Sequence, residues 1–148
     1  VKTIEEGKGL LEENIKNKSA LNKLCEMVEA QGGDASYIKD PSKFGKAKYI
    51  IDVKSNKDGY IKEINALEIG EAAMKLGAGR ATKEDNIEFA TGIVLEKKVG
   101  SKVNKGDTLC KVYSNKEHVE SILLEVVESF KITNEELKTL PIIYEIVE

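Results

Sequence analysis

The stretch GSKVNKGDTLCKVYSNKE, from Gly100 to Glu117, decides how the second half of the chain folds. Apolar and polar residues alternate on both sides of the turn Lys105-Gly106-Asp107, which is the pattern of two half-buried β-strands joined by a tight turn. The longer run, Thr108 to Ser114, predicts a strand. Lys116 follows this strand almost at once, and the role of a lysine at this place is the first question that the sequence raises.

A strand, a turn and a lysine in this order resemble the hammerhead-shaped domains that carry biotin or lipoyl groups. In such domains the carrier lysine lies at the tip of a hairpin, and a strand follows it directly. The segment after Lys116, from Glu117 to Phe130, has apolar residues at helical spacing instead. The sequence therefore predicts an exposed Lys116 at a strand-to-helix junction. A carrier module with Lys116 as its attachment site is the alternative function.

Outward from this stretch, short strands and helices are mixed without the regular alternation of a parallel sheet. The expected strands are 49–55, 60–64, 87–96, 108–114 and a closing strand, 142–147. The first two are expected to form a hairpin across Asp58-Gly59. The expected helices are 67–76, ended by Gly77, and 117–130. The predicted fold is α+β, with a hammerhead- or barrel-sandwich-like antiparallel sheet and packed helices.

The first part of the chain predicts two helices, one over 2–18 and one that begins after Ser19 as N-cap and stops at Gly32-Gly33. Their apolar stripes cannot cover each other completely, so another part of the protein should cover them. We therefore expect terminal helices of a larger domain in 1–33, a linker in 34–48 and an α+β domain in 49–148. The chain begins without Met inside a predicted helix, which suggests a fragment of a longer protein.

Composition excludes several classes of partner. With 23 basic and 26 acidic residues among 148, the chain has no excess of positive charge for a nucleic acid. No apolar run has the length of a membrane span, and the acidic start is unlike a signal peptide. Cys25 and Cys110 lie far apart without His or Cys at ligand spacing, so we expect two reduced, partly buried thiols in a cytoplasmic protein and no metal site.

The stretch Leu76-Gly-Ala-Gly-Arg80 has the glycine content of a phosphate-binding loop but not its context. A dinucleotide fingerprint needs a third glycine where Thr82 stands, and a strand before the loop rather than a helix. The negative end of the helix dipole also disfavours phosphate at a helix C-terminus. Gly77 is therefore predicted to end the helix, with Gly79 and Arg80 in the loop that follows.

The remaining polar candidates do not form a catalytic set. His118 is the only histidine, and no nucleophile or orienting partner lies near it in sequence, so we expect it to be solvated. The carboxylates Glu84, Asp85 and Glu88 are unspecific, although Asp85 is placed to cap or tether the loop. No catalytic, cofactor-binding or metal-binding residue is assigned to this chain.

Four motifs occur in a fixed order: GYI-x-x-I at 59–64, IG-x-x-A-x-x-LGAGR at 69–80, D-x-I-x-x-x-x-G-I at 85–93 and V-x-x-GD at 103–107. Together with ALNKLCEMVEAQGGD at 20–34, they resemble the C-terminal part of pyrimidine-nucleoside phosphorylases and the related thymidine phosphorylases. Ser101 departs from the family, which often has Asp after Gly100. Asp107 matches the family pattern, so the turn Lys105-Gly106-Asp107 is still predicted.

The resemblance implies a homodimeric enzyme that cleaves a pyrimidine nucleoside with inorganic phosphate, its co-substrate, giving the free base and a pentose 1-phosphate. Phosphate and nucleoside would bind between a helical domain and an α/β domain. The family's binding residues lie in the earlier two-thirds of such proteins, so none is carried over and this chain alone is expected to be inactive. Residues 1–33 would be the last helices of the α/β domain.

The rest of the chain would then support that domain, with the loop 76–85 as the expected contact with moving parts. Preference for uridine or thymidine stays open, and so does a relative that acts on nucleotide monophosphates. A stand-alone interaction domain is the third hypothesis.

Overall fold

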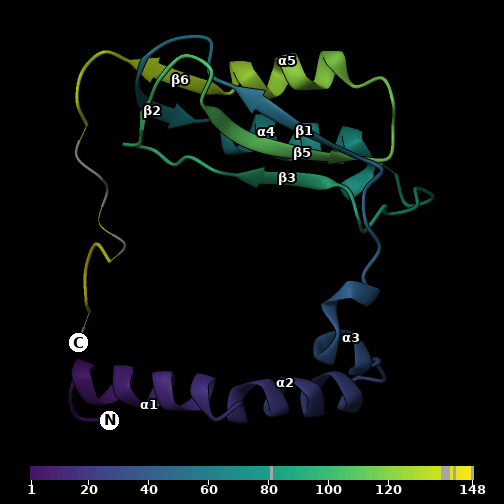
Figure 1. The fold of residues 1–148 in the computed structure, drawn as a ribbon, viewed down its shortest axis with the longest axis vertical. Coiled ribbons are helices and arrows are strands. Elements are labelled where there is room, and N and C mark those ends of the chain that lie inside the picture. The colour runs from purple at the N-terminus through teal and green to yellow at the C-terminus, as the bar shows by residue number, and fades with distance from the viewer. Residues whose placement is uncertain (81, 138–140, 142, 148) are drawn as a thin grey trace. The chain divides into compact units, whose positions relative to one another are not determined.

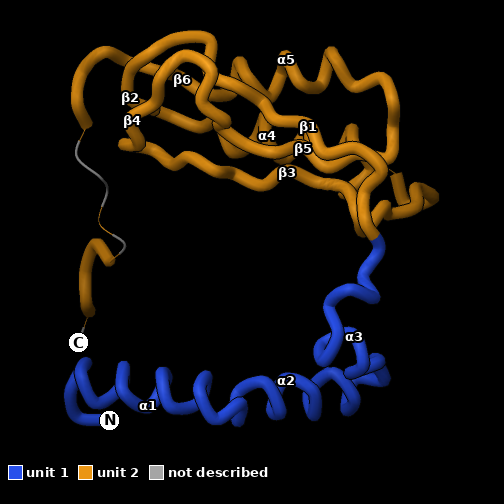
Figure 2. Tube along the Cα trace, viewed as in Figure 1, with its two compact units in different colours: residues 1–45 blue, residues 46–148 orange. Residues whose placement is uncertain are grey.

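A computed structural model gives the fold of residues 1–80, 82–137, 141 and 143–147 (Figure 1). The chain divides into two compact units, residues 1–45 and residues 46–148 (Figure 2). Among the residues described, the first unit is helical and all the strands belong to the second. In the same residues, no helix is long and apolar enough to cross a membrane.

The first unit begins with the two predicted helices, α1 (Ile4–Lys16) and α2 (Ser19–Ala30). The sequence predicted Ser19 as the N-cap of α2, but Ser19 is the first residue of this helix. The preceding Lys18 has a left-handed backbone, with a φ of 64°. The side chain of Asn17 accepts a hydrogen bond from the Ser19 N–H at 2.9 Å, and the Ser19 hydroxyl turns back to donate to Asn14 Oδ1 at 2.7 Å. Asn17 therefore satisfies the backbone donor at this junction.

These two helices bury little of their apolar surface. α1 buries no residue, and the only buried residue of α2 is Cys25. Ile4, Leu11 and Ile15 all remain exposed, as does Met27 on the second helix. The apolar stripes that the sequence predicted are therefore present and lack a cover among the residues that the structure describes.

The first unit ends in two short turns, α3 (Ser36–Lys39) and the 3₁₀ helix η1 (Pro41–Lys43). Asp34 lies before α3 and accepts the N–H of Ser36 at 2.8 Å, and hydrogen bonds from Ser36 lower the pKa of Asp34 below its ordinary value. The rings of Tyr37 and Phe44 pack edge to face, with their centroids 5.2 Å apart.

In the described residues of the second unit there are two three-stranded antiparallel sheets, which confirms the predicted α+β class. The strands are β1 (Tyr49–Lys54), β2 (Gly59–Ile64), β3 (Gly92–Leu95), β4 (Lys102–Val103), β5 (Thr108–Ser114) and β6 (Phe130–Thr133). One sheet has the order β1-β5-β3 and the other the order β4-β2-β6. The central strand β5 has the bounds predicted from the sequence.

The predicted hairpin between the first two strands is wrong. β1 pairs with β5, whereas β2 pairs with β4 and β6, so the turn between β1 and β2 leads from one sheet to the other. Three hydrogen bonds hold this turn against the loop that precedes β5. Ser55 N donates to Asp107 O and Gly106 N donates to Ser55 O, both at 2.8 Å, while Lys105 N donates to Asp58 Oδ1 at 2.7 Å.

The predicted helix 117–130 is shorter in the structure, where α5 spans Glu120–Glu128. Phe130 does not extend its apolar face but begins β6, a strand that the sequence did not predict. The N–H of Asn65 donates to Ser129 O at 2.9 Å, where the chain leaves α5 for β6. The two-residue strand β4 was also missed, because so short a segment has no recognisable alternation.

Two predicted strands are wrong in part or in full. Of 87–96, only β3 is a strand, because the N–H of Glu88 bonds to Gly77 O at 2.9 Å and the N–H of Thr91 bonds back to Glu88 O at 3.0 Å. These bonds make residues 88–91 a turn. The closing strand is absent from residues 143–147, which have no regular structure and expose their apolar side chains, while Ile142 lies outside the described residues.

The core of the second unit is formed by both sheets and by two helices, α4 (Ala66–Ala73) and α5. Asn65 caps α4, since its Oδ1 accepts the N–H of Leu67 at 3.1 Å. The buried apolar side chains are Val53, Ile61, Ala72, Leu76, Val103, Leu109, Cys110, Val112, Val119, Ile122, Val126 and Phe130. This core positions the loop that follows α4 and the junction between β5 and α5.

Candidate functional site

The glycine stretch lies where α4 ends in a single π turn, η2 (Met74–Ala78). Gly77 has a φ of 108°, and a Cβ at this position would lie 3.1 Å from Glu88 Cγ. The positive φ and the close approach both favour glycine. The α-helix itself ends at Ala73, earlier than predicted, and Gly77 is the residue of the following π turn whose backbone leaves the helical conformation. The backbone oxygen of Gly77 accepts the N–H of Glu88 and is not directed at a ligand.

The loop after Gly77 is held by its own polar groups. Asp85 Oδ2 accepts the N–H of Thr82 at 2.9 Å, which confirms its predicted role as a tether. Farther along, Thr91 donates its N–H and its hydroxyl to Glu88 O, at 3.0 and 2.8 Å. The carboxylates singled out in the sequence therefore include one that organises this loop.

Lys116 lies between β5 and α5, at the predicted strand-to-helix junction. Its ammonium group donates to Lys75 O in the π turn at 2.7 Å, and its N–H donates to Ser114 Oγ at 2.9 Å. A carrier lysine must extend freely from a hairpin tip, whereas Lys116 spans two elements. The carrier alternative has no support from this geometry.

Asn115 joins three segments that are distant in sequence. Its side-chain amide donates to Glu88 Oε2 at 2.7 Å, and its Oδ1 accepts the N–H of Lys48 at 3.1 Å. Asn115, at the end of β5, therefore connects the loop after α4 with the residues that lead into β1. Sequence reasoning missed Asn115, and also Asn65, although an asparagine directly before an apolar helical pattern is an N-cap signal that was available.

His118 is solvated, as predicted. Its side chain is 85% exposed, and its nearest charged partner is Glu120, with Nδ1 and Oε1 3.8 Å apart. A pair this exposed has little effect on stability. His118 therefore does not join the polar groups around Asn115 and Glu88.

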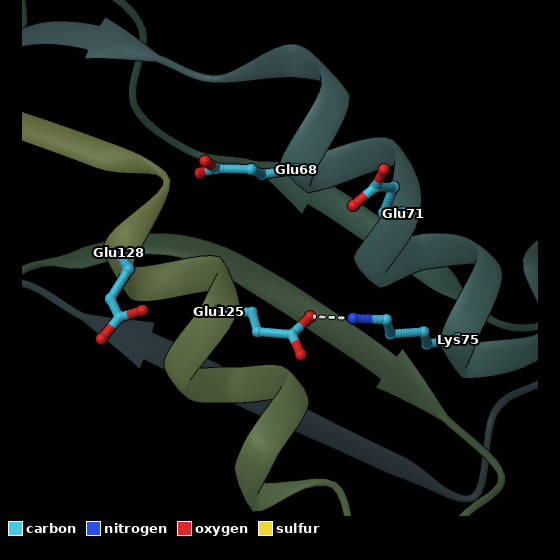
Figure 3. Close-up of a pocket in the computed structure, with 5 residues that line it drawn as sticks. All are labelled: Glu68, Glu71, Lys75, Glu125 and Glu128. Atoms are coloured by element: carbon cyan, nitrogen blue, oxygen red, sulfur yellow. Dashed lines mark hydrogen bonds and ion pairs between the residues drawn. The ribbon is translucent and has the colours of Figure 1, made fainter.

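An acidic pocket of about 270 Å³ lies between α4 and α5 (Figure 3). Glu68 and Glu71 line it from α4, Glu125 and Glu128 line it from α5, and Lys75 pairs with Glu125 at 2.7 Å. Four carboxylates against one ammonium group repel an anion. The pocket is therefore unsuited to phosphate, the co-substrate that the sequence resemblance implies.

Both cysteines are free, as the sequence predicted, and they are buried more fully than the predicted partial burial. Burial raises the pKa of the Cys110 thiol to about 12, so this group is not a nucleophile at neutral pH. Over the described ranges, no group of three or more His, Cys, Asp and Glu side chains is placed to hold a metal ion.

Raising the pH should destabilise the chain through Cys110. Between pH 9 and 12 the unfolded thiol, with its ordinary pKa of 9.0, loses its proton, while the folded thiol keeps it up to about pH 12. The free energy of unfolding should therefore fall, by about 1 kcal/mol from this group at pH 10. Urea unfolding at pH 8 and pH 10 measures the fall. Cys110→Ala is the control, because it keeps every other pH-dependent group, and equal falls in both proteins would contradict the assignment.

Several curated proteins that are similar to this chain are named pyrimidine-nucleoside phosphorylase. The chain is 46% identical over 143 residues to the pyrimidine-nucleoside phosphorylase of Geobacillus stearothermophilus, which covers 97% of this chain and 33% of that protein. It is 49% identical over 133 residues to the Bacillus subtilis protein of that name, with 90% and 31% covered. The Staphylococcus haemolyticus protein is 45% identical over 130 residues, with 88% and 30% covered. The chain thus spans about a third of the length of these relatives.

The family model of the pyrimidine nucleoside phosphorylase C-terminal domain matches residues 60–133. These residues run from β2 to the end of β6 and include Gly77, the loop after it, Asn115 and α5. The match spans half of the chain and contains the elements that form most of the core. The chain therefore belongs to the pyrimidine nucleoside phosphorylase family, within the C-terminal domain.

Proposed function

We propose that this chain is part of an enzyme that cleaves pyrimidine nucleosides with inorganic phosphate to give the free base and a pentose 1-phosphate. The observation that carries the proposal is the high identity to three proteins named pyrimidine-nucleoside phosphorylase, each matched over about a third of its length. In this proposal the catalytic residues lie in the part of the enzyme that precedes the matched third. This chain supports that part.

The chemistry of this chain supports such a division of roles. Phosphorolysis needs cationic and hydroxyl donors that converge on a phosphate. The pocket between α4 and α5 offers four carboxylates instead, and Arg80 follows the negative end of a helix rather than the positive one. His118, a possible proton donor, is exposed and pairs only loosely with Glu120.

In the proposed enzyme, phosphate attacks the anomeric carbon through an oxocarbenium-like transition state while the bond to the base breaks. Donors outside this chain hold the phosphate and stabilise the charge on the departing base, and closure of the two large domains brings the reactants together. The exposed apolar stripes of α1 and α2 fit helices that pack on an α/β domain. We propose that the loop 76–85 contacts the moving parts, and that the enzyme is a cytoplasmic homodimer.

Phosphorolysis of uridine and thymidine, followed as release of free base, tests this proposal. The 148-residue chain should be inactive, and the full-length product of the same gene should be active. Protein that lacks the 148 residues should be less stable to heat than the full-length product, because it would lose its support. Activity in the 148-residue chain would contradict the proposal, and so would a full-length product that releases no base from either nucleoside.

A further inference from the structure

Phe89 is the most exposed large apolar residue of the described chain. Its side chain is 94% exposed, although it lies within the turn 88–91 that closes the loop after α4. A phenylalanine held in water forgoes roughly 1.5–3 kcal/mol that burial would supply. Exposed aromatic residues of this kind often anchor protein interfaces.

The turn that presents Phe89 is fixed from both sides. Thr91 bonds twice to Glu88 O, and Glu88 N bonds to Gly77 O. The carboxylate of Glu88 accepts the side-chain amide of Asn115, which in turn accepts the N–H of Lys48. Because the backbone of the turn is already held, docking would have to order only the side chain of Phe89.

A shallow hollow of about 330 Å³ adjoins the turn. Its lining residues, which are mostly apolar, are Ala90, Thr91, Gly92, Ile93, Val94 and Tyr113. Val94 is exposed, and β3 is an edge strand, since β5 is its one partner among the strands that the structure describes. Phe89 directly precedes Ala90, the first residue that lines this hollow, and the two features together are here called the Phe89 patch.

The size of the Phe89 patch indicates what covers it. Phe89 and six lining residues fall far short of the roughly 20–30 residues a side that a stable complex between separate proteins uses. A contact this small is sufficient between parts of one polypeptide, because the tether raises the effective concentration. The chain spans about a third of its relatives' length, and the patch lies within the matched family domain.

We propose that Phe89 docks into an apolar pocket on the part of the same polypeptide that precedes this chain, and that Asn115 is the residue that positions the Phe89 turn. The inference deepens the proposed support role and rests on it. It adds the turn at 88–91 to the loop 76–85 as a contact with that part of the polypeptide.

Hydrogen exchange read by mass spectrometry tests the docking without any assay of activity. Amides of residues 88–92 should exchange at least tenfold more slowly in the full-length product than in the 148-residue chain. Phe89→Ala should abolish most of that protection, whereas Leu124→Ala, which removes an apolar side chain that is 64% exposed on α5, should preserve it. Equal exchange in the two proteins, or protection that survives Phe89→Ala, would overturn the docking.

The role of Asn115 is tested in the 148-residue chain with two variants that swap the hydrogen-bond donor and acceptor between Asn115 and Glu88. Asn115→Asp removes the donor to Glu88 and should speed amide exchange at 88–92 about two- to tenfold, the range expected for one hydrogen bond. Adding Glu88→Gln returns a donor from the other side and should restore slow exchange. No acceleration, or no rescue, would refute the positioning role.

Hydrogen exchange tests the docking and the activity assay tests the proposed reaction, so either proposal can be contradicted without the other. If the full-length product protects the turn but releases no base from uridine or thymidine, the proposed reaction is wrong and the docking stands. If the product is active but leaves the turn unprotected, the docking is wrong and the proposed reaction stands.

Discussion

Replacing Gly59 by alanine should destabilise the chain by about 2–5 kcal/mol, because strain and overpacking act at the same residue. Gly59 has a φ of 145° at the start of β2. An added Cβ would clash with Thr133 O and lie 2.8 Å from Ile132 Cγ2. The backbone cannot move away easily, since β2 is bonded to β4 on one side and β6 on the other.

Gly106→Ala is the matched control for Gly59→Ala. Gly106 also has a positive φ, 94°, but no heavy atom lies within 4 Å of the Cβ it would gain. It should therefore show backbone strain alone, about 1–2 kcal/mol. The chain has no tryptophan and five tyrosines, so urea unfolding followed by tyrosine fluorescence measures both variants. Equal losses would mean that the contact with β6 is not what restricts position 59.

The positions of the central strands were predictable, but their partners were not. Alternation from Thr108 to Ser114 and the turns on either side marked β5 with its full bounds. Alternation says nothing about which strand lies alongside. β1 and β2 are adjacent in sequence, yet the bonds of Ser55 and Asp58 to the loop at 105–107 send them to different sheets. Pairing of this kind depends on contacts between turns about 50 residues apart.

The limits of α5 were unpredictable for another reason. The apolar residues from Val119 to Phe130 fit one helical face, and nothing in that pattern marks its end. The structure ends the helix at Glu128, and Phe130 and Ile132 then enter a strand beside β2. A short apolar run is compatible with a helix or a strand. Here the pairing with β2 makes residues 130–133 a strand.

The local parts of the candidate site were predictable, and the links between them were not. Gly77 and Asp85 act on backbone groups within a few residues or at a helix end, so the sequence contained their signal. Asn115 bonds to Glu88 and Lys48, which lie 27 and 67 residues away. Only the folded sheet brings these residues together.

Replacing Leu76 by alanine should cost about 2–5 kcal/mol of the free energy of unfolding, since it leaves a cavity in the core. Leu76 is 1% exposed and lies in the π turn η2, among the core side chains of the second unit. The same turn contributes the oxygens of Lys75 and Gly77 that bind Lys116 and the Glu88 turn. The substitution should therefore also loosen the Phe89 turn, and hydrogen exchange at 88–92 should rise together with the loss of stability.

Leu67→Ala is the control for Leu76→Ala, because it also removes a leucine side chain but not one from the core. Leu67 lies in the first turn of α4 and is 70% exposed, so the free energy of unfolding should change by no more than about 0.5 kcal/mol. Exchange at 88–92 should stay as it is in the original chain. If Leu76→Ala lowered stability but left that exchange unchanged, the π turn would fill the core without holding the loop. The loop would then depend on Asn115 alone, and Asn115→Asp would have the larger effect on exchange.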